Sequence, residues 1–84
     1  MNKKKLLARL QSNRKNVRYN DFILLVKSFG FKYRRTEGSH NIYKNPIINE
    51  ALNLQEEKGE AKPYQVKQFL AIIEKYNLKM ECEQ

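Results

Sequence analysis

The residue best suited to chemistry in this sequence is His40, the only histidine in a chain of 84 residues. Histidine is the one side chain whose unperturbed pKa, about 6.5, suits proton transfer near neutral pH. His40 directly follows Gly38 and Ser39 and begins an alternating run with aromatic and β-branched residues. We therefore expect His40 near the end of a β-hairpin, where a large substrate can reach it.

Cationic side chains accompany this histidine on both predicted strands. Arg34 and Arg35 precede the turn, and Lys44 follows it. Antiparallel pairing across a two-residue turn would bring residues 34–36 close to residues 39–41. A guanidinium group can hold a phosphate by two-point contact. The residues of this hairpin that we predict to bind RNA are Arg34, Arg35, Ser39 and Lys44.

This cluster permits cleavage of RNA without a metal ion or another cofactor. The ribose 2′-OH attacks the adjacent phosphorus, a base removes its proton, an acid protonates the departing 5′ oxygen, and cations stabilise the charged intermediate. His40 alone supplies only one of the two proton transfers at a time, so the neighbouring cations must share the work. The alternative is that His40 only occupies a strand edge and has no catalytic role.

Other catalytic chemistries find little support. Glu56 and Glu57 are neighbours near a predicted strand end, so their carboxylates point apart, and no His or Cys accompanies them as a metal ligand. Cys82 is the only cysteine, which rules out an intrachain disulfide and fits a reducing cytoplasm. Ser39 and His40 are strand neighbours and point in opposite directions, which disfavours a serine nucleophile.

The distribution of charge favours a polyanionic partner. Residues 1–35 carry eleven Lys or Arg against one Asp, whereas residues 36–84 carry six basic and eight acidic side chains, so the halves contribute +10 and −2 to the net +8. Nucleic acid fits such a basic region because each neutralised phosphate releases counterions. The alternatives are solubility alone or an acidic protein partner. No apolar run is long enough for a signal peptide or a membrane span, so we expect no membrane association.

Helical spacing of apolar residues predicts three helices. The first covers residues 3–11, the second begins after an N-cap at Asn20 and ends at Gly30, and the third begins at Pro63. The apolar positions at helical spacing are Leu6, Leu7 and Leu10 in the first, Phe22, Leu25, Val26 and Phe29 in the second, and Val66, Phe69, Leu70, Ile73 and Tyr76 in the third.

Three strands are predicted between the last two helices, over residues 31–36, 39–45 and 51–56, with a turn at Glu37-Gly38 and a loop over residues 57–62. The fold class is therefore α+β, a three-stranded antiparallel sheet with helices packed on one face and a short additional N-terminal helix. The last five elements, in the order α-β-β-β-α, are those of a double-stranded-RNA-binding domain.

The alternating pattern of residues 39–45 does not determine which side chains of this strand point to the core. If Ile42 points to the core, alternation places His40 at the rim of the sheet or requires a bulge. Tyr33 and Tyr43 are predicted either to pack in the core or to stack on bases.

The order of these features resembles the HicA toxin family over about residues 19–78. The matching residues are Asp21-Phe22, the run from Ser28 to Phe31, the run from Arg34 to His40, Lys62-Pro63, and Leu70. The resemblance implies a fold like that of double-stranded-RNA-binding domains and an mRNA endoribonuclease that acts in the cytoplasm without the ribosome. It also implies catalysis by His40, and a HicB-type antitoxin that covers this face and through which an oligomer forms.

We divide the chain accordingly into a basic extension over residues 1–18, a HicA-like domain over 19–78 and a polar tail over 79–84. Lys62 resembles the lysines with which double-stranded-RNA-binding domains grip phosphates, helped by the helix N-terminus behind it. The alternative to a toxin endoribonuclease is a non-catalytic RNA-binding module of the same fold.

Overall fold

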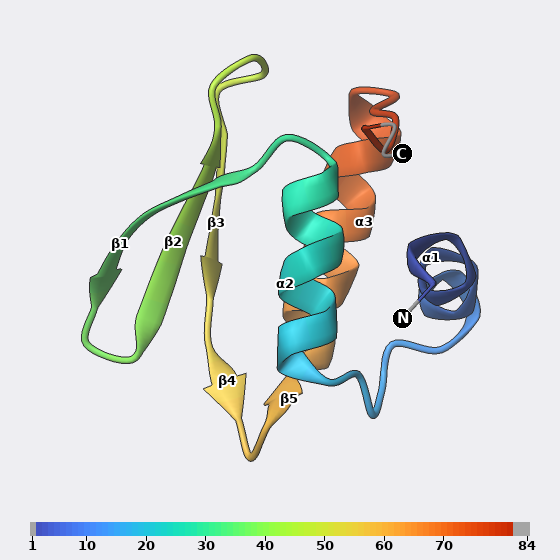
Figure 1. The fold of residues 1–84 in the computed structure, drawn as a ribbon, viewed down its shortest axis with the longest axis horizontal. Coiled ribbons are helices and arrows are strands. Elements are labelled where there is room, and N and C mark those ends of the chain that lie inside the picture. The colour runs from blue at the N-terminus through green and yellow to red at the C-terminus, as the bar shows by residue number, and fades with distance from the viewer. Residues whose placement is uncertain (1, 82–84) are drawn as a thin grey trace.

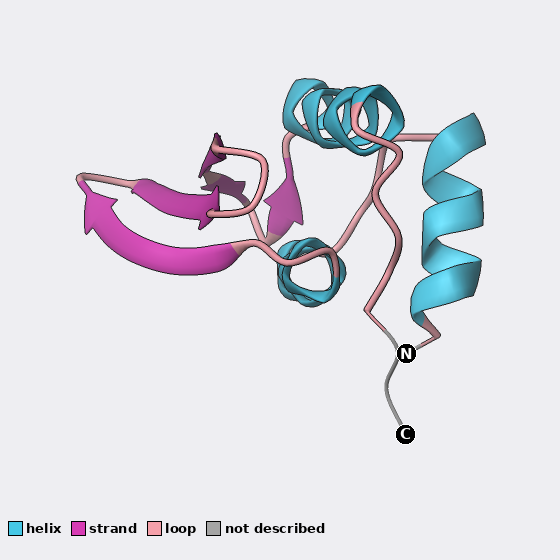
Figure 2. Ribbon diagram, turned by 90° about the horizontal axis from the view of Figure 1, so that it is seen from above, coloured by secondary structure: helices cyan, strands magenta, loops and turns pink. Residues whose placement is uncertain are grey.

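Helices and strands form two layers, with the sheet on one side of the molecule and the helices on the other (Figures 1 and 2). The computed structural model describes residues 2–81. Its elements are α1 (Lys3–Ser12), α2 (Tyr19–Ser28), β1 (Lys32–Glu37), β2 (His40–Asn45), β3 (Glu50–Leu54), β4 (Glu56–Glu57), β5 (Glu60–Ala61) and α3 (Pro63–Lys75). The predicted α+β class and the three-stranded antiparallel sheet are confirmed.

The sheet has the strand order β1-β2-β3. The pairing of β1 with β2 includes a tight turn after β1 and a β-bulge within β1. Glu37 pairs with His40, so the turn consists of Gly38 and Ser39, one residue later than predicted. Gly38 adopts a left-handed φ of 61°, which glycine tolerates without a steric cost. A β-bulge lies between Tyr33 and Arg35, which leaves Arg34 without a cross-strand partner.

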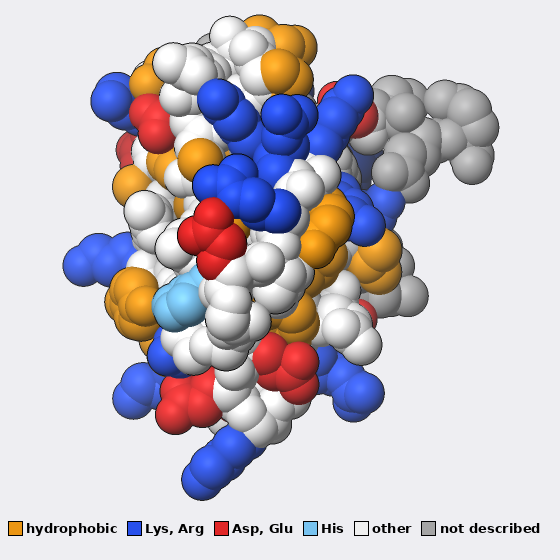
Figure 3. Space-filling model, turned by 90° about the vertical axis from the view of Figure 1, so that its left-hand side faces the viewer, with side chains coloured by type: hydrophobic (Ala, Val, Ile, Leu, Met, Phe, Trp, Pro, Cys, Tyr) orange, Lys and Arg blue, Asp and Glu red, His pale blue; other side chains and the backbone are white. Residues whose placement is uncertain are grey.

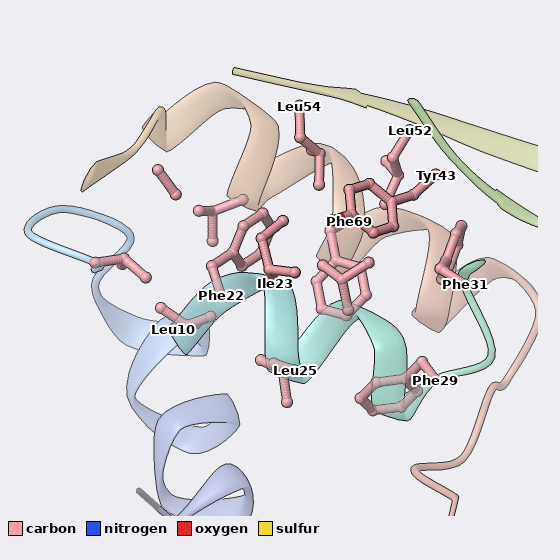
Figure 4. Packing of buried hydrophobic residues seen from close by; sticks show 14 of the residues in the cluster. Leu10, Phe22, Ile23, Leu25, Phe29, Phe31, Tyr43, Leu52, Leu54 and Phe69 are labelled. Carbon is pink, nitrogen blue, oxygen red and sulfur yellow. The ribbon is translucent and has the colours of Figure 1, made fainter. Parts of the chain in front are cut away.

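Phe69 of α3 is the centre of the hydrophobic core (Figure 4). Its ring meets those of Phe22, Phe29 and Phe31 edge-to-face, with centroid distances of 5.5, 5.6 and 6.2 Å. Such edge contacts between aromatic rings stabilise a core beyond the burial of their area. The sheet covers this cluster with the buried hydrophobic residues of β2 and β3, which are Tyr43, Leu52 and Leu54.

The N-terminal helix α1 packs against the same core. Leu10 is completely buried and Val17 of the following connector is almost so, at 0% and 1% exposure. Arg9 Nη2 donates to the carbonyl oxygens of Lys15 and Asn16, at 2.7 and 3.0 Å, and so holds the connector against the helix. The basic extension therefore contributes apolar side chains to the fold.

The predicted loop over residues 57–62 is a small β4–β5 hairpin that pairs with this connector. Ala61 N donates to Val17 O at 2.8 Å, and Tyr19 N donates to Gly59 O at 2.9 Å. The second bond explains why α2 begins at Tyr19 with Arg18 as N-cap, and not after Asn20 as predicted. A helix needs partners for its first amides, and here a distant loop supplies one.

The remaining helix boundaries follow the predicted signals. Pro63 occupies the first turn of α3, after Lys62 as N-cap. Gly30 ends α2 with a left-handed φ of 95°, and a Cβ atom there would lie 3.2 Å from Asn45 Nδ2. Within residues 2–81, the structure contains no helix long and apolar enough to cross a membrane.

Candidate active site

The face of the sheet that points away from the helices carries His40. Tyr43 and Asn45 are buried on the helical side, at 7% and 2% exposure, and Asn41 Nδ2 donates to the hydroxyl of Tyr19 on α2 at 2.8 Å. Because side chains alternate along a strand, His40, Ile42 and Lys44 lie on the opposite face. Ile42 is therefore not a core residue, and β2 needs no bulge to expose His40. We call this surface the open face.

Figure 3 shows the open face, with the histidine in pale blue and a group of Lys and Arg side chains above it. The His40 side chain is partly buried and makes no hydrogen bond with the residues that the structure describes. Its Nδ1 atom is buried without a partner. The fold therefore leaves Nε2 as the ring nitrogen that a substrate can approach.

Glu37 lies directly opposite His40 in the β1–β2 ladder. Directly opposed residues have Cβ atoms about 4.5–5.5 Å apart. Arg35 Nε donates to Glu37 Oε2 at 2.5 Å, and both side chains are well exposed. Arg35 therefore lies near His40 as predicted, but it is engaged by a carboxylate. Sequence reasoning missed Glu37 because the turn was placed one residue too early.

Arg34 and Lys44 lie at the other end of the open face. Together with Lys32, Pro46 and Asn49 they line a hollow of about 230 Å³. Lys44 is four residues beyond His40 on the same face of β2, which separates their Cα atoms by about 13 Å. The predicted cluster is therefore divided into two groups, one at the His40 turn and one at this hollow.

A chain of hydrogen bonds brings Lys62 to the turn. Gln55 Nε2 donates to Ser39 Oγ at 2.8 Å, and Lys62 Nζ donates to Gln55 Oε1 at 2.7 Å. The backbone amide of Gln55 donates to Oε1 of the buried Gln65 at 3.0 Å, and this bond fixes the position of Gln55. Gln55 has no charge and belongs to no motif, so the sequence offered no signal for it.

The two tyrosines left open by the sequence have different roles. Tyr43 is buried, and burial raises the pKa of its hydroxyl, so it is a core residue and not a surface for base stacking. Tyr33 is 51% exposed and packs edge-to-face on Tyr43, with a centroid distance of 5.6 Å. Of these two tyrosines, only Tyr33 has an exposed ring.

No group of three His, Cys, Asp or Glu within residues 2–81 is arranged to hold a metal ion. Cys82 and the end of the predicted polar tail lie outside the described residues.

The fold and this site define a class of small basic α+β proteins in which a three-stranded antiparallel sheet, in an arrangement compatible with a double-stranded-RNA-binding domain, carries a histidine on its open face. Residues 19–74 match the family described as HicA toxin of bacterial toxin-antitoxin, which covers more than half of the sequence. The chain belongs to the HicA toxin family, as its motifs predicted. No curated protein and no solved structure shows a significant match. Helix α1 precedes the matched residues.

Proposed function

We propose that this HicA-family toxin is an endoribonuclease that cleaves mRNA by a metal-independent reaction, with His40 as the general acid or base. The observation that carries the proposal is the position of His40, on the open face at the start of β2, with Nε2 unclaimed by any described residue. Imidazole is the side chain that most often serves as a general acid or base in catalysis.

The proposed reaction uses the ribose 2′-OH of the substrate as nucleophile, so that no activated water is needed. The 2′ oxygen forms a bond to phosphorus while the bond from phosphorus to the 5′ oxygen breaks. One proton leaves the 2′-OH and one proton reaches the 5′ oxygen, which gives a 2′,3′-cyclic phosphate and a free 5′-OH. His40 Nε2 performs one of these two transfers, worth roughly 10²- to 10⁴-fold in rate.

Cations around the turn would stabilise the negative charge that develops on phosphorus. Arg35 is the nearest along the ladder, and a phosphate would compete with Glu37 for its guanidinium group. Lys62 is tied to Ser39 through Gln55, at the N-terminus of α3, where the helix dipole favours an anion. We propose that Arg35, Ser39 and Lys62 bind the RNA around the scissile bond, and that Arg34 and Lys44 bind it farther along.

The partner we propose is a HicB-type antitoxin that covers the open face in the cytoplasm and forms an oligomer with the toxin. Membership of a toxin-antitoxin family supports a protein partner. An antitoxin seated over His40 would block RNA by occupying the same surface. Co-purification of the two proteins, with loss of RNA cleavage when the antitoxin is added, is the expected result.

The deciding experiment compares RNA degradation by the wild type and by His40→Ala. We expect cleavage to fall at least about 100-fold, with an unchanged circular dichroism spectrum. Asn53→Ala is the matched control, because Asn53 is exposed and pairs with Ile42 on the same face. Undiminished cleavage by His40→Ala would contradict the proposal.

A non-catalytic RNA-binding module is the second candidate, favoured by the cationic hollow that lies apart from His40. It predicts that the wild type binds RNA with a steep salt dependence and produces no cleavage products. Products that form with the wild type but not with His40→Ala would exclude it.

A further inference from the structure

The hollow at the far end of the open face carries an unusual concentration of positive charge. Its three charged lining residues are Lys32, Arg34 and Lys44, and its other two, Pro46 and Asn49, are uncharged. Among the described residues, none of the three cations forms an ion pair. The hollow therefore lacks the carboxylate that partly neutralises Arg35 near His40.

The register of the sheet makes this arrangement unfavourable in the absence of an anion. Lys32 and Lys44 are directly opposite each other in the β1–β2 ladder. Like charges at directly opposed positions destabilise a sheet. The bulge adds a third positive charge to the hollow. It leaves Arg34 outside the ladder, so that Arg34 lines the hollow although the next residue, Arg35, lies on the open face as well. A bound anion would relieve the repulsion among all three.

The size of the hollow indicates which anion. Sites for small molecules occupy roughly 300–1,000 Å³, whereas this hollow occupies about 230 Å³ and is open to solvent through its exposed lysines. It is suited to a single phosphate group. A larger hollow of about 470 Å³ lies between α1 and α3, but its lining contains one cation, Arg14, and one carboxylate, Glu74, so its formal charges cancel.

We propose that Lys32, Arg34 and Lys44 form a second phosphate subsite, which binds an RNA phosphate other than the one cleaved at His40. This inference rests on the proposed ribonuclease function. The separation of about 13 Å between His40 and Lys44 along β2 exceeds one nucleotide step of a sugar-phosphate chain. The substrate strand then runs along β2 over Ile42, and an RNA must extend beyond the nucleotides on either side of the scissile bond to occupy both sites.

The test compares two substrates of different length. A dinucleoside monophosphate contains only the scissile phosphate, whereas a longer oligoribonucleotide with one cleavable linkage also reaches the hollow. For Arg34→Gln and Lys44→Gln we expect kcat/KM on the longer RNA to fall about tenfold, as for loss of one charge-assisted hydrogen bond. On the dinucleotide we expect no change. Lys27→Gln, which removes an exposed charge on α2, is the matched control.

Two results would overturn the subsite. An equal loss on both substrates would place these cations at the scissile phosphate, and no loss on either would mean that they do not bind RNA. If the ribonuclease proposal fails, the result is different, because no RNA cleavage then depends on His40.

The subsite can still be tested by RNA binding in that case. Lys44→Gln should reduce the slope of log RNA affinity against log salt concentration by about 0.7 for a single strand, and an unchanged slope would refute the subsite.

Discussion

The polar side chains of β2 differ between the two faces of the sheet in whether the fold supplies their hydrogen-bond partners. On the helical face of β2, Asn41 and Asn45 have their polar groups paired, with Asn45 Nδ2 donating to Phe29 O at 3.1 Å and Oδ1 accepting from Ile47 N at 3.0 Å. On the open face, the side chains of His40 and Lys44 have no hydrogen-bond or ion-pair partner among the described residues. The fold satisfies the polar side chains of the helical face, whereas on the open face even the buried Nδ1 atom of His40 has no hydrogen-bond partner among the described residues.

This contrast separates the residues that maintain the structure from those proposed to act on RNA. Substitutions on the helical face should lower the free energy of unfolding, and they should affect cleavage only through the folded population. Substitutions of His40 and of the cations on the open face should alter RNA cleavage or binding and change stability by no more than about 1 kcal/mol. The following predictions test this division.

The largest effect is expected from Phe69→Ala. Removal of this ring leaves a cavity where three phenylalanine rings now converge, at a cost of about 3–5 kcal/mol in the free energy of unfolding. Since small domains have only about 5–15 kcal/mol in total, the variant should also lose activity by unfolding. Urea denaturation measures the change, with Phe69→Leu as the milder control. An unfolding midpoint equal to that of the wild type would contradict the central position of this ring.

Asn45→Ala should have the next largest effect. It removes the side chain that joins the end of β2 to the end of α2, and it leaves the buried carbonyl of Phe29 and the partly buried amide of Ile47 without these partners. The expected cost is about 1–3 kcal/mol, measured by thermal unfolding. Asn53→Ala, an asparagine on the open face, should change stability by less than about 0.5 kcal/mol. Similar losses in both variants would break the distinction between the faces.

Lys44→Glu should move stability and RNA binding in opposite directions. The new carboxylate lies opposite Lys32, so a repulsive cross-strand pair becomes an attractive one worth about 0.2–1 kcal/mol. RNA affinity should fall, because the hollow changes from three positive charges to a net single one. Thermal unfolding and RNA binding at fixed salt measure the two effects. A variant that loses both stability and affinity would argue against unrelieved repulsion in the wild type.

The smallest effect concerns alkaline pH. Burial raises the pKa of Tyr19, and the nearby Glu56 adds to this, while the hydrogen bond from Asn41 acts in the opposite direction. The folded state therefore favours the neutral phenol. The resulting contribution to stability is complete below the ordinary pKa of about 10 and is lost as pH rises through the higher pKa of the folded state. Stability measured across this range should decline less in Tyr19→Phe than in the wild type.

Elements with local signals were predictable from the sequence. The 3.6-residue spacing of Phe22, Leu25 and Val26 identified α2, and the same spacing in α3 identified Val66 and Phe69, all of which are buried. Pro63 and Gly30 also marked helix ends correctly. These features depend on contacts between residues close in the chain, so a short window contains the necessary information.

Features set by distant contacts were not predictable. The start of α2 depends on the carbonyl of Gly59, about forty positions later, and the link from Lys62 to the turn depends on Gln55. The position of the turn differed from the prediction because both Glu37-Gly38 and Gly38-Ser39 place a glycine where a tight turn allows one. The choice between them requires the pairing of the whole strand.

Arg34 has a consequence for how β1 tolerates change in length. Since it lies outside the ladder, its deletion would leave Tyr33 opposite Tyr43 and Arg35 opposite Ile42, as they are now. Deletion of a paired residue such as Tyr33 would have one of two effects. Either Arg34 would take the vacant place in the ladder, or the side chains of the rest of the strand would move to the opposite face of the sheet. Arg34 is thus the one residue of β1 that can be deleted without changing the pairing of β1 with β2, so only the surface properties of its side chain constrain this position.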